Sequence, residues 1–294
     1  MEQLLQQLVN GVSLGSIYAL IALGYTMVYG IINLINFAHG DIYMIGAYVG
    51  FALTTFLGLG FFPSLLISMV VCSILGMAIE KVVYKPIRNS TRIAALITAI
   101  SVSLFLQYTM MYFVKPDTRT FPEVLANKKL TFLGDSIILD MKNIYIVLIT
   151  ILLMVALQYI VHKTKIGKAM RAVSLDKEAA ELMGINVDKV ISYTFAMGSA
   201  LAGAAGVLVG VYYNTINPLM GAGPGLKAFV AAVLGGIGII PGAVFGGFFL
   251  GMTETMVSAY GGSIFKDAVA FTILIIVLLV KPNGLLGKTI KEKV

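Results

Sequence analysis

Long apolar runs, separated by short polar segments, follow one another from one end of the chain to the other. Most of them approach about 20 residues, the length that a helix needs to cross the hydrocarbon core of a bilayer. The run at 228–240 is shorter, and we expect it to form a half-helix or re-entrant element. The runs cover 9–34, 38–59, 62–79, 93–114, 144–161, 190–213, 228–240, 243–260 and 264–280. This pattern predicts an all-α, polytopic transmembrane bundle of about eight or nine membrane segments.

Composition supports a membrane protein rather than a soluble one. The 294 residues are 59% hydrophobic and 12% charged, with a mean hydropathy of +0.93. An average soluble domain has roughly 25% charged residues. No long polar linker interrupts the runs, so we expect a single transmembrane domain over residues 1–294.

The distribution of basic residues predicts the orientation. Lysines and arginines gather at 81–92, 163–189 and 281–293, and cytoplasmic loops of membrane proteins carry such an excess. Placing all three regions in the cytoplasm requires an odd number of crossings, with the N-terminus outside and the C-terminus inside. The segment 115–143 is then external, although it also carries five basic residues. We interpret the net charge of +7 as this topology signal and expect no nucleic-acid partner.

Small residues recur four positions apart inside the runs, as in Gly11 and Gly15 or Gly247 and Gly251. Such pairs allow helix backbones to approach closely in a membrane, so we expect tight packing within the chain. The stretch Gly11-Val-Ser-Leu-Gly15 also matches a serine-hydrolase motif, but that motif requires a preceding strand. We find no metal-binding cluster and no nucleophile with its base in the sequence, which argues against an enzyme.

One polar cluster interrupts the apolar sequence near the N-terminus. It consists of Asn33, Asn36, His39 and Asp41. Ionisable groups at membrane depth are costly and indicate a functional site. The alternative is a cytoplasmic turn in which the asparagines close one helix and Asp41 caps the next. Glu254 raises the same question, and we favour an interhelical structural bond for it.

Two interrupted stretches, at 30–50 and 235–251, each place a polar or Gly-Pro break between apolar halves. Paired interruptions of this kind are found at the transport sites of many carriers.

The polar segment 163–189 carries the strongest functional signal. Within it, Asp176 is a candidate N-cap, Glu178 suits the positive end of the helix dipole, and Gly184 can end the helix in a left-handed conformation. We therefore predict a helix of about two turns between two membrane spans, with a small apolar face from Ala179, Ala180, Leu182 and Met183. Taken alone, this face would favour a helix resting on lipid.

At this segment the sequence resembles the permease subunits of bacterial ABC importers, through Glu178-Ala179-Ala180 followed by Gly184. More closely, the chain is similar to the branched-chain amino acid permease family. The stretches that carry this resemblance are Gly24–Gly30, Asn33–Asp41, Gly184–Val187 and Val233–Ala243.

The resemblance implies an assembly in the bacterial inner membrane. Its other members would be a second permease, expected to be a different homologous chain, two cytoplasmic ATPase subunits and an extracytoplasmic substrate-binding protein. ATP and Mg²⁺ would be bound by the ATPase subunits, and this chain would need no cofactor. The resemblance also implies that 163–189 is a cytoplasmic coupling loop. Its ATPase-coupling residues would be Asp176, Glu178, Ala179, Ala180 and Gly184.

The implied function is the translocation of branched-chain amino acids by alternating access. An aliphatic zwitterion needs apolar walls and a few polar groups along its path. The candidates are Tyr25, Tyr29, Asn33, Asn36, His39 and Asp41. Two alternatives stay open: a permease for urea or short amides, and an ion-coupled secondary transporter that would use Asp41 or Glu254.

Overall fold

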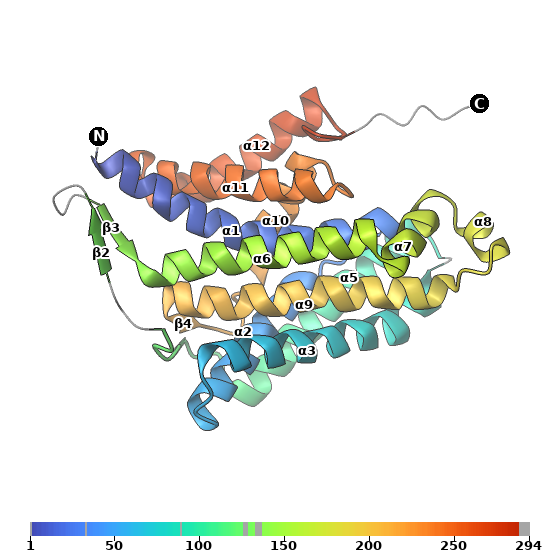
Figure 1. The fold of residues 1–294 in the computed structure, drawn as a ribbon, viewed down its shortest axis with the longest axis horizontal. Helices are drawn as coiled ribbons and strands as arrows, with labels where there is room; N and C mark the ends of the chain where they lie inside the picture. The colour runs from blue at the N-terminus through green and yellow to red at the C-terminus, as the bar shows by residue number, and fades with distance from the viewer. Residues whose placement is uncertain (1, 33, 89, 126–128, 133–136, 288–294) are drawn as a thin grey trace.

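A computed structural model describes residues 2–32, 34–88, 90–125, 129–132 and 137–287. The chain is a helical bundle in which every predicted apolar run lies in a helix (Figure 1). The long helices are α1 (Glu2–Ile32), α2 (His39–Phe56), α3 (Phe61–Ile79), α5 (Arg92–Val114), α6 (Met141–Lys163), α9 (Val187–Tyr213), α10 (Ala222–Gly235), α11 (Ile240–Met256) and α12 (Lys266–Val280).

Shorter helical elements extend or connect these helices. A π-helical segment η1 (Glu80–Tyr84) and α4 (Lys85–Ile87) continue α3, and η2 (Val257–Gly261) and η3 (Ser263–Phe265) join α11 to α12. Helices α7 (Lys165–Leu175) and α8 (Lys177–Leu182) lie between α6 and α9.

Within the described residues, seven helices are long and apolar enough to cross a membrane. They are α1, α3, α5, α6, α9, α11 and α12, several with their short extensions. Helices α2 and α10 are not among them. Both are largely buried, α2 against α3 and α9 and α10 against α1 and α11. These two helices therefore lie in the interior of the bundle together with α1 and α9, the most buried of the seven spans.

The short apolar run was predicted at 228–240, but α10 covers Ala222–Gly235. It begins earlier because Pro224 lies in the first turn of the helix, where proline's missing N–H costs no hydrogen bond. It ends earlier because Gly236 and Gly238 have φ values of 107° and 93°, which glycine adopts readily. The expected half-helix is present, shifted by about one and a half turns.

Helices α1 and α11 pack with their backbones in close approach. A Cβ atom on Gly15 would lie 2.8 Å from the Cα of Phe248, and one on Gly11 would lie 2.9 Å from the Cα of Met252. The backbone of Gly251 on α11 also lies against the backbone of Gly15 on α1. The predicted tight packing of small residues is confirmed, and the hydrolase-like stretch is the interior of a helix, where Ser13 donates to the carbonyl of Val9.

The segment 115–143 contains strands that the sequence did not predict. Strand β1 (Arg119–Thr120) pairs antiparallel with β4 (Thr215–Ile216), and β2 (Lys129–Phe132) pairs with β3 (Ile137–Asp140). Figure 1 shows β2 and β3 at the same end of the bundle as the start of α1, with α7 and α8 at the opposite end. The tail lysines Lys288, Lys291 and Lys293 fall outside the described residues.

Candidate functional site

Helix α8 is a short helix with both ends fixed. The side chain of Asp176 accepts a hydrogen bond from the N–H of Ala179 at 3.0 Å, as predicted for an N-cap. At the other end, Gly184 has a φ of 80°, and the N–H groups of Gly184 and Ile185 donate to the carbonyls of Glu181 and Ala180. These two bonds form a Schellman motif, which ends the helix at this glycine.

The predicted apolar face of α8 divides into two parts. Ala180 is 4% exposed and packs into the hydrophobic core of the bundle. Leu182 and Met183 are 88% and 82% exposed, and Leu175, just before the helix, is equally open. Ala179 and Glu178 are exposed as well. The helix is thus anchored through Ala180 and presents an apolar tip away from the bundle.

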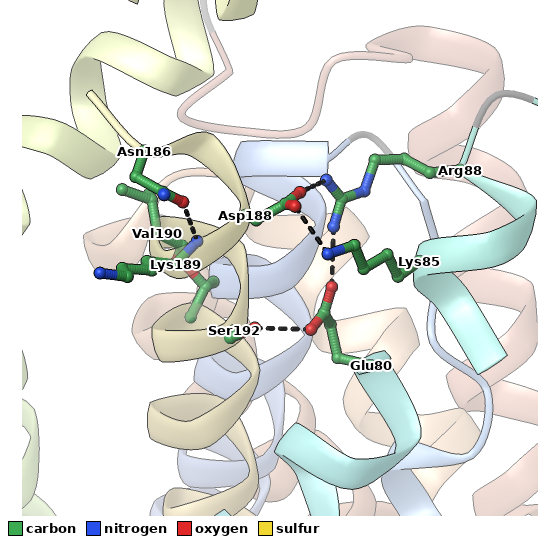
Figure 2. Close-up of polar contacts among 9 residues, drawn as sticks. Glu80, Lys85, Arg88, Asn186, Asp188, Lys189, Val190 and Ser192 are labelled. Carbon is green, nitrogen blue, oxygen red and sulfur yellow. Dashed lines mark hydrogen bonds and ion pairs between the residues drawn. The ribbon is translucent and has the colours of Figure 1, made fainter. Parts of the chain in front are cut away.

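A cluster of charged side chains lies at the start of α9, directly after α8 (Figure 2). The guanidinium of Arg88 contacts the carboxylates of Glu80 at 2.7 Å and Asp188 at 2.6 Å. Lys85 contacts the same Asp188 at 2.7 Å, and Ser192 donates to Glu80 at 2.6 Å. We call these five residues the α9 clamp, because they join η1 and α4 to the first turns of α9.

The clamp lies close to α8. Burial, and then the charge of Arg88, lower the pKa of Lys177, the first residue of α8. Asn186 caps α9 by accepting a hydrogen bond from the N–H of Lys189 at 2.9 Å. Only three residues separate the Schellman glycine of α8 from the first clamp residue of α9, Asp188. The end of α8 and the clamp are therefore close neighbours along the chain.

The clamp also reaches the break between α1 and α2. Tyr84, at the end of η1, donates to the side-chain oxygen of Asn36 at 2.9 Å and packs against Phe195 of α9 at a ring distance of 5.3 Å. Asn36 lies in the break and is 2% exposed. One continuous set of contacts thus connects α8, α9, η1 and the polar break.

The described members of the predicted pathway set lie in α1, in the break and at the start of α2, but they do not form one cluster. Tyr25 and His39 pack edge to face at a ring distance of 4.8 Å. Asp41 does not cap α2, because the N-cap is Ala38 and no side chain bonds there, but it accepts a hydrogen bond from Gln107 of α5 at 2.9 Å. Tyr29 is half-buried one turn beyond Tyr25. Asn33 lies outside the described residues.

The break of α1–α2 meets the break of α10–α11. A Cβ atom on Gly30 would lie 3.3 Å from the Cα of Gly238, and Gly40 at the start of α2 approaches Gly225 of α10. The two interrupted stretches that the sequence indicated are therefore adjacent in space. A cavity of about 80 Å³ opens beside them, lined in part by Thr26, Gly30, Arg171, Ser174 and Gly238.

Several buried polar atoms around this region have no hydrogen-bond partner among the described residues. They are Thr26 Oγ1, Asn36 Nδ2, Tyr43 OH and Tyr48 OH. Buried polar groups are normally satisfied by protein or water. Together with His39 Nε2, they make up half of the ten such atoms among the described residues, and most of the other five lie on α6 or at its start.

Glu254 belongs to a separate buried network. It accepts hydrogen bonds from Lys227 at 2.7 Å and from Tyr18 at 2.8 Å, and Lys227 also contacts Asp267 at 2.6 Å. The network joins α1, α10, α11 and α12, so Glu254 makes the interhelical bond that we favoured from the sequence. Lys227 was not recognised from the sequence, although a lysine within an apolar run is itself a signal of a buried partner.

Seven helices able to span a membrane, among the residues that the structure describes, define a polytopic helical membrane protein. A family model described as the permease component of branched-chain amino acid transport systems matches residues 7–278. The chain belongs to this permease family.

Individual relatives agree along nearly the full length. The chain is 45% identical to the high-affinity branched-chain amino acid transport system permease protein LivH of Escherichia coli K12, over 99% of this chain and 97% of that protein. It is 44% identical to BraD of Pseudomonas aeruginosa, over 99% and 98% of the two chains. Among solved structures, PsaBC from Streptococcus pneumoniae in complex with Fab shares the fold with a TM-score of 0.50 at 13% identity, covering 95% of this chain and 91% of that one.

Proposed function

We propose that the chain is one of two permease subunits in an ATP-driven importer of branched-chain amino acids in the bacterial inner membrane. The named function of its full-length relatives supports the substrate class. The second permease would be a different homologous chain. Two ATPase subunits would bind ATP and Mg²⁺ in the cytoplasm, and an extracytoplasmic binding protein would deliver the amino acid. The permease fold would be a single domain over residues 1–294.

The observation that carries this proposal is the form of α8. Its exposed apolar residues Leu175, Leu182 and Met183 suit a protein groove, whereas Ala180 holds the helix to the bundle. In this proposal Asp176 and Gly184 fix the two ends of α8, and Glu178 and Ala179 contact the ATPase. The coupling loop 163–189 would then be cytoplasmic, with the N-terminus outside and the C-terminus inside.

Movement of α8 would reach the pathway through the α9 clamp. Closure of the ATPase pair pushes α8, which shifts the start of α9 and, through Arg88 and Glu80, the π-helical segment η1. Tyr84 then moves Asn36 in the break. π-Helical segments are frequent at functional sites, and bistable packed elements of this kind convert small shifts into switching. The ATPase subunits would supply the energy. The contacts that differ between the outward-open and inward-open states would lie in this chain.

The translocated amino acid would pass the break between α1 and α2. Tyr25, Tyr29, Asn33, Asn36, His39 and Asp41 remain the proposed polar lining, together with Thr26, Tyr43 and Tyr48. The cavity beside Gly30 and Gly238 would be the cytoplasmic end of this path, because Arg171 and Ser174 of the coupling loop line it.

Co-purification of the chain with its co-expressed neighbours, followed by ATPase assays with the binding protein, tests this function. We expect leucine, isoleucine and valine to stimulate hydrolysis, whereas urea and acetamide should not. Stimulation by urea or acetamide alone would contradict the substrate class.

A matched pair of variants tests the docking surface. Leu182→Ser should weaken recovery of the ATPase subunits without lowering the melting temperature, because Leu182 is almost fully exposed. Val82→Ser removes a similarly exposed apolar side chain from η1 and should have no such effect. Equal recovery of the ATPase with both variants would contradict docking at α8.

A further inference from the structure

A wide groove runs along the outside of the bundle between two spanning helices, α6 and α11. It encloses about 980 Å³ and follows α6 from Met154 to Lys163 and α11 from Ile240 to Phe248. At a rise of 1.5 Å per residue, these helices flank it for about 12 to 13 Å. Both helices also pack on α1.

The walls of the groove are apolar along most of this length. Val155 and Tyr159 of α6 are 56% and 62% exposed, and Phe245 of α11 is 48% exposed. Val244 and Phe248 complete the same wall. Because α6 and α11 both qualify as membrane spans, the groove lies along the membrane-spanning part of the bundle, and its walls match the chemistry of an acyl chain.

One end of the groove is positively charged. The last turn of α6 contributes His162 and Lys163, both exposed. The N-terminus of α11 lies at the same end, since Ile240 and Val161 line one adjoining cavity. No side-chain hydrogen bond caps α11, so the positive end of its dipole adds to the charge of Lys163. Among the described residues that line the groove, none is acidic.

We propose that this groove binds an anionic phospholipid, with its phosphate at His162 and Lys163 and an acyl chain along Val155, Tyr159 and Phe245. Basic pockets between spanning helices bind anionic head groups in this way. A second permease in the same orientation suits the groove less well. The basic residues of a second permease would lie at the same membrane level. They would therefore face, and be repelled by, the positive charge of Lys163.

Native mass spectrometry of the full-length chain in detergent tests the site. We expect dioleoyl-phosphatidylglycerol to bind at a severalfold lower concentration than dioleoyl-phosphatidylcholine. The double variant His162→Gln/Lys163→Gln should lose at least about fivefold of this preference, as expected for the loss of one or two cations near the lipid surface. Both side chains are exposed, so the variant should fold normally. Lys81→Gln, an exposed lysine on η1, is the matched control and should keep the preference.

A second variant separates the lipid from a protein occupant. Val244→Trp narrows the groove between α6 and α11 and should lower the binding of both lipids. Equal affinity for the two lipids in the unmodified chain would overturn the proposal, as would an unchanged preference in the double variant. A Val244→Trp variant that binds both lipids normally but no longer recovers a second permease would assign the groove to that partner and would also overturn it.

Discussion

Nη1 of Arg88 lies 2.6 Å from Oδ1 of Asp188, across 100 positions of the chain. The same guanidinium contacts Glu80, whose side chain is 1% exposed. Arg88 therefore connects the segment after α3 to the first turn of α9, next to the helix proposed to receive the ATPase.

Replacing Arg88 by alanine should abolish uptake and destabilise the chain. The change leaves the buried carboxylate of Glu80 without its cation, and loss of one partner of a buried ion pair costs on the order of 3–5 kcal/mol. Because Arg88 is 17% exposed, we expect the lower end of this range. Thermal unfolding in detergent measures the stability, and proteoliposome uptake measures the coupling.

The double variant Arg88→Ala/Glu80→Gln separates these two effects. It removes the unpaired charge and should recover much of the melting temperature, but uptake should stay low because the clamp is still broken. Full uptake in the double variant would mean that Arg88 serves stability alone.

Ala180→Arg should abolish uptake while the chain still inserts into the membrane. Ala180 is 4% exposed and packs into the core, so an arginine side chain cannot fit without displacing α8. Radiolabelled leucine uptake, with membrane-fraction immunoblots for insertion, measures the effect. Ala180→Ser is the control and should retain most uptake, because serine is almost as small. Normal uptake by the arginine variant would count against a fixed position for α8.

Gly24→Ala should reduce both stability and transport. A Cβ on Gly24 would collide with the ring of His39 and would lie 3.0 Å from the carbonyl oxygen of Gly198. Overpacking of this kind costs about 1–3 kcal/mol. Gly223→Ala, in the first turn of α10, meets no atom within 4 Å and should be neutral or slightly stabilising. A Gly24→Ala variant as stable and active as Gly223→Ala would contradict the position of His39.

Lys227→Met should destabilise the chain by roughly 3 kcal/mol, because Glu254 is 5% exposed and would keep only the more distant Lys266, at 3.9 Å, as its cation. Adding Glu254→Gln should recover part of the loss, although Asp267 would remain unpaired. Melting temperatures of the two variants provide the comparison. A double variant less stable than Lys227→Met would show that Glu254 is satisfied by other partners, such as Tyr18.

The apolar pattern was sufficient to predict each long helix, since lipid requires long apolar segments with internally satisfied backbones. The residue types Asp176 and Gly184 were sufficient to predict the two ends of α8, because each caps the helix through bonds to residues close by in the sequence. The boundaries of α10 were wrong, because the continuous apolar run begins only after Lys227 and because Gly236 and Gly238, both with positive φ, lay within the predicted run.

Pairings between distant residues could not be derived from the pattern. The sequence showed Arg88 and Lys85 only as members of a basic cluster. Their shared partner Asp188 could not be identified, because the pairing depends on the packing of α9 beside η1. The two-residue strands β1 and β4 are too short for a sequence signal, and the packing of Phe121 and its neighbours brings them together. Ala180 was expected on the exposed face of α8, but a six-residue helix shows too little periodicity to assign its faces.

Leucine uptake by proteoliposomes tests the central claim, that this chain transports only when driven through α8 by a partner ATPase. We predict uptake when the chain is reconstituted with its second permease, ATPase subunits and binding protein in the presence of ATP. The chain alone should take up no leucine under an imposed proton gradient. Proton-driven uptake by the chain alone would contradict the account.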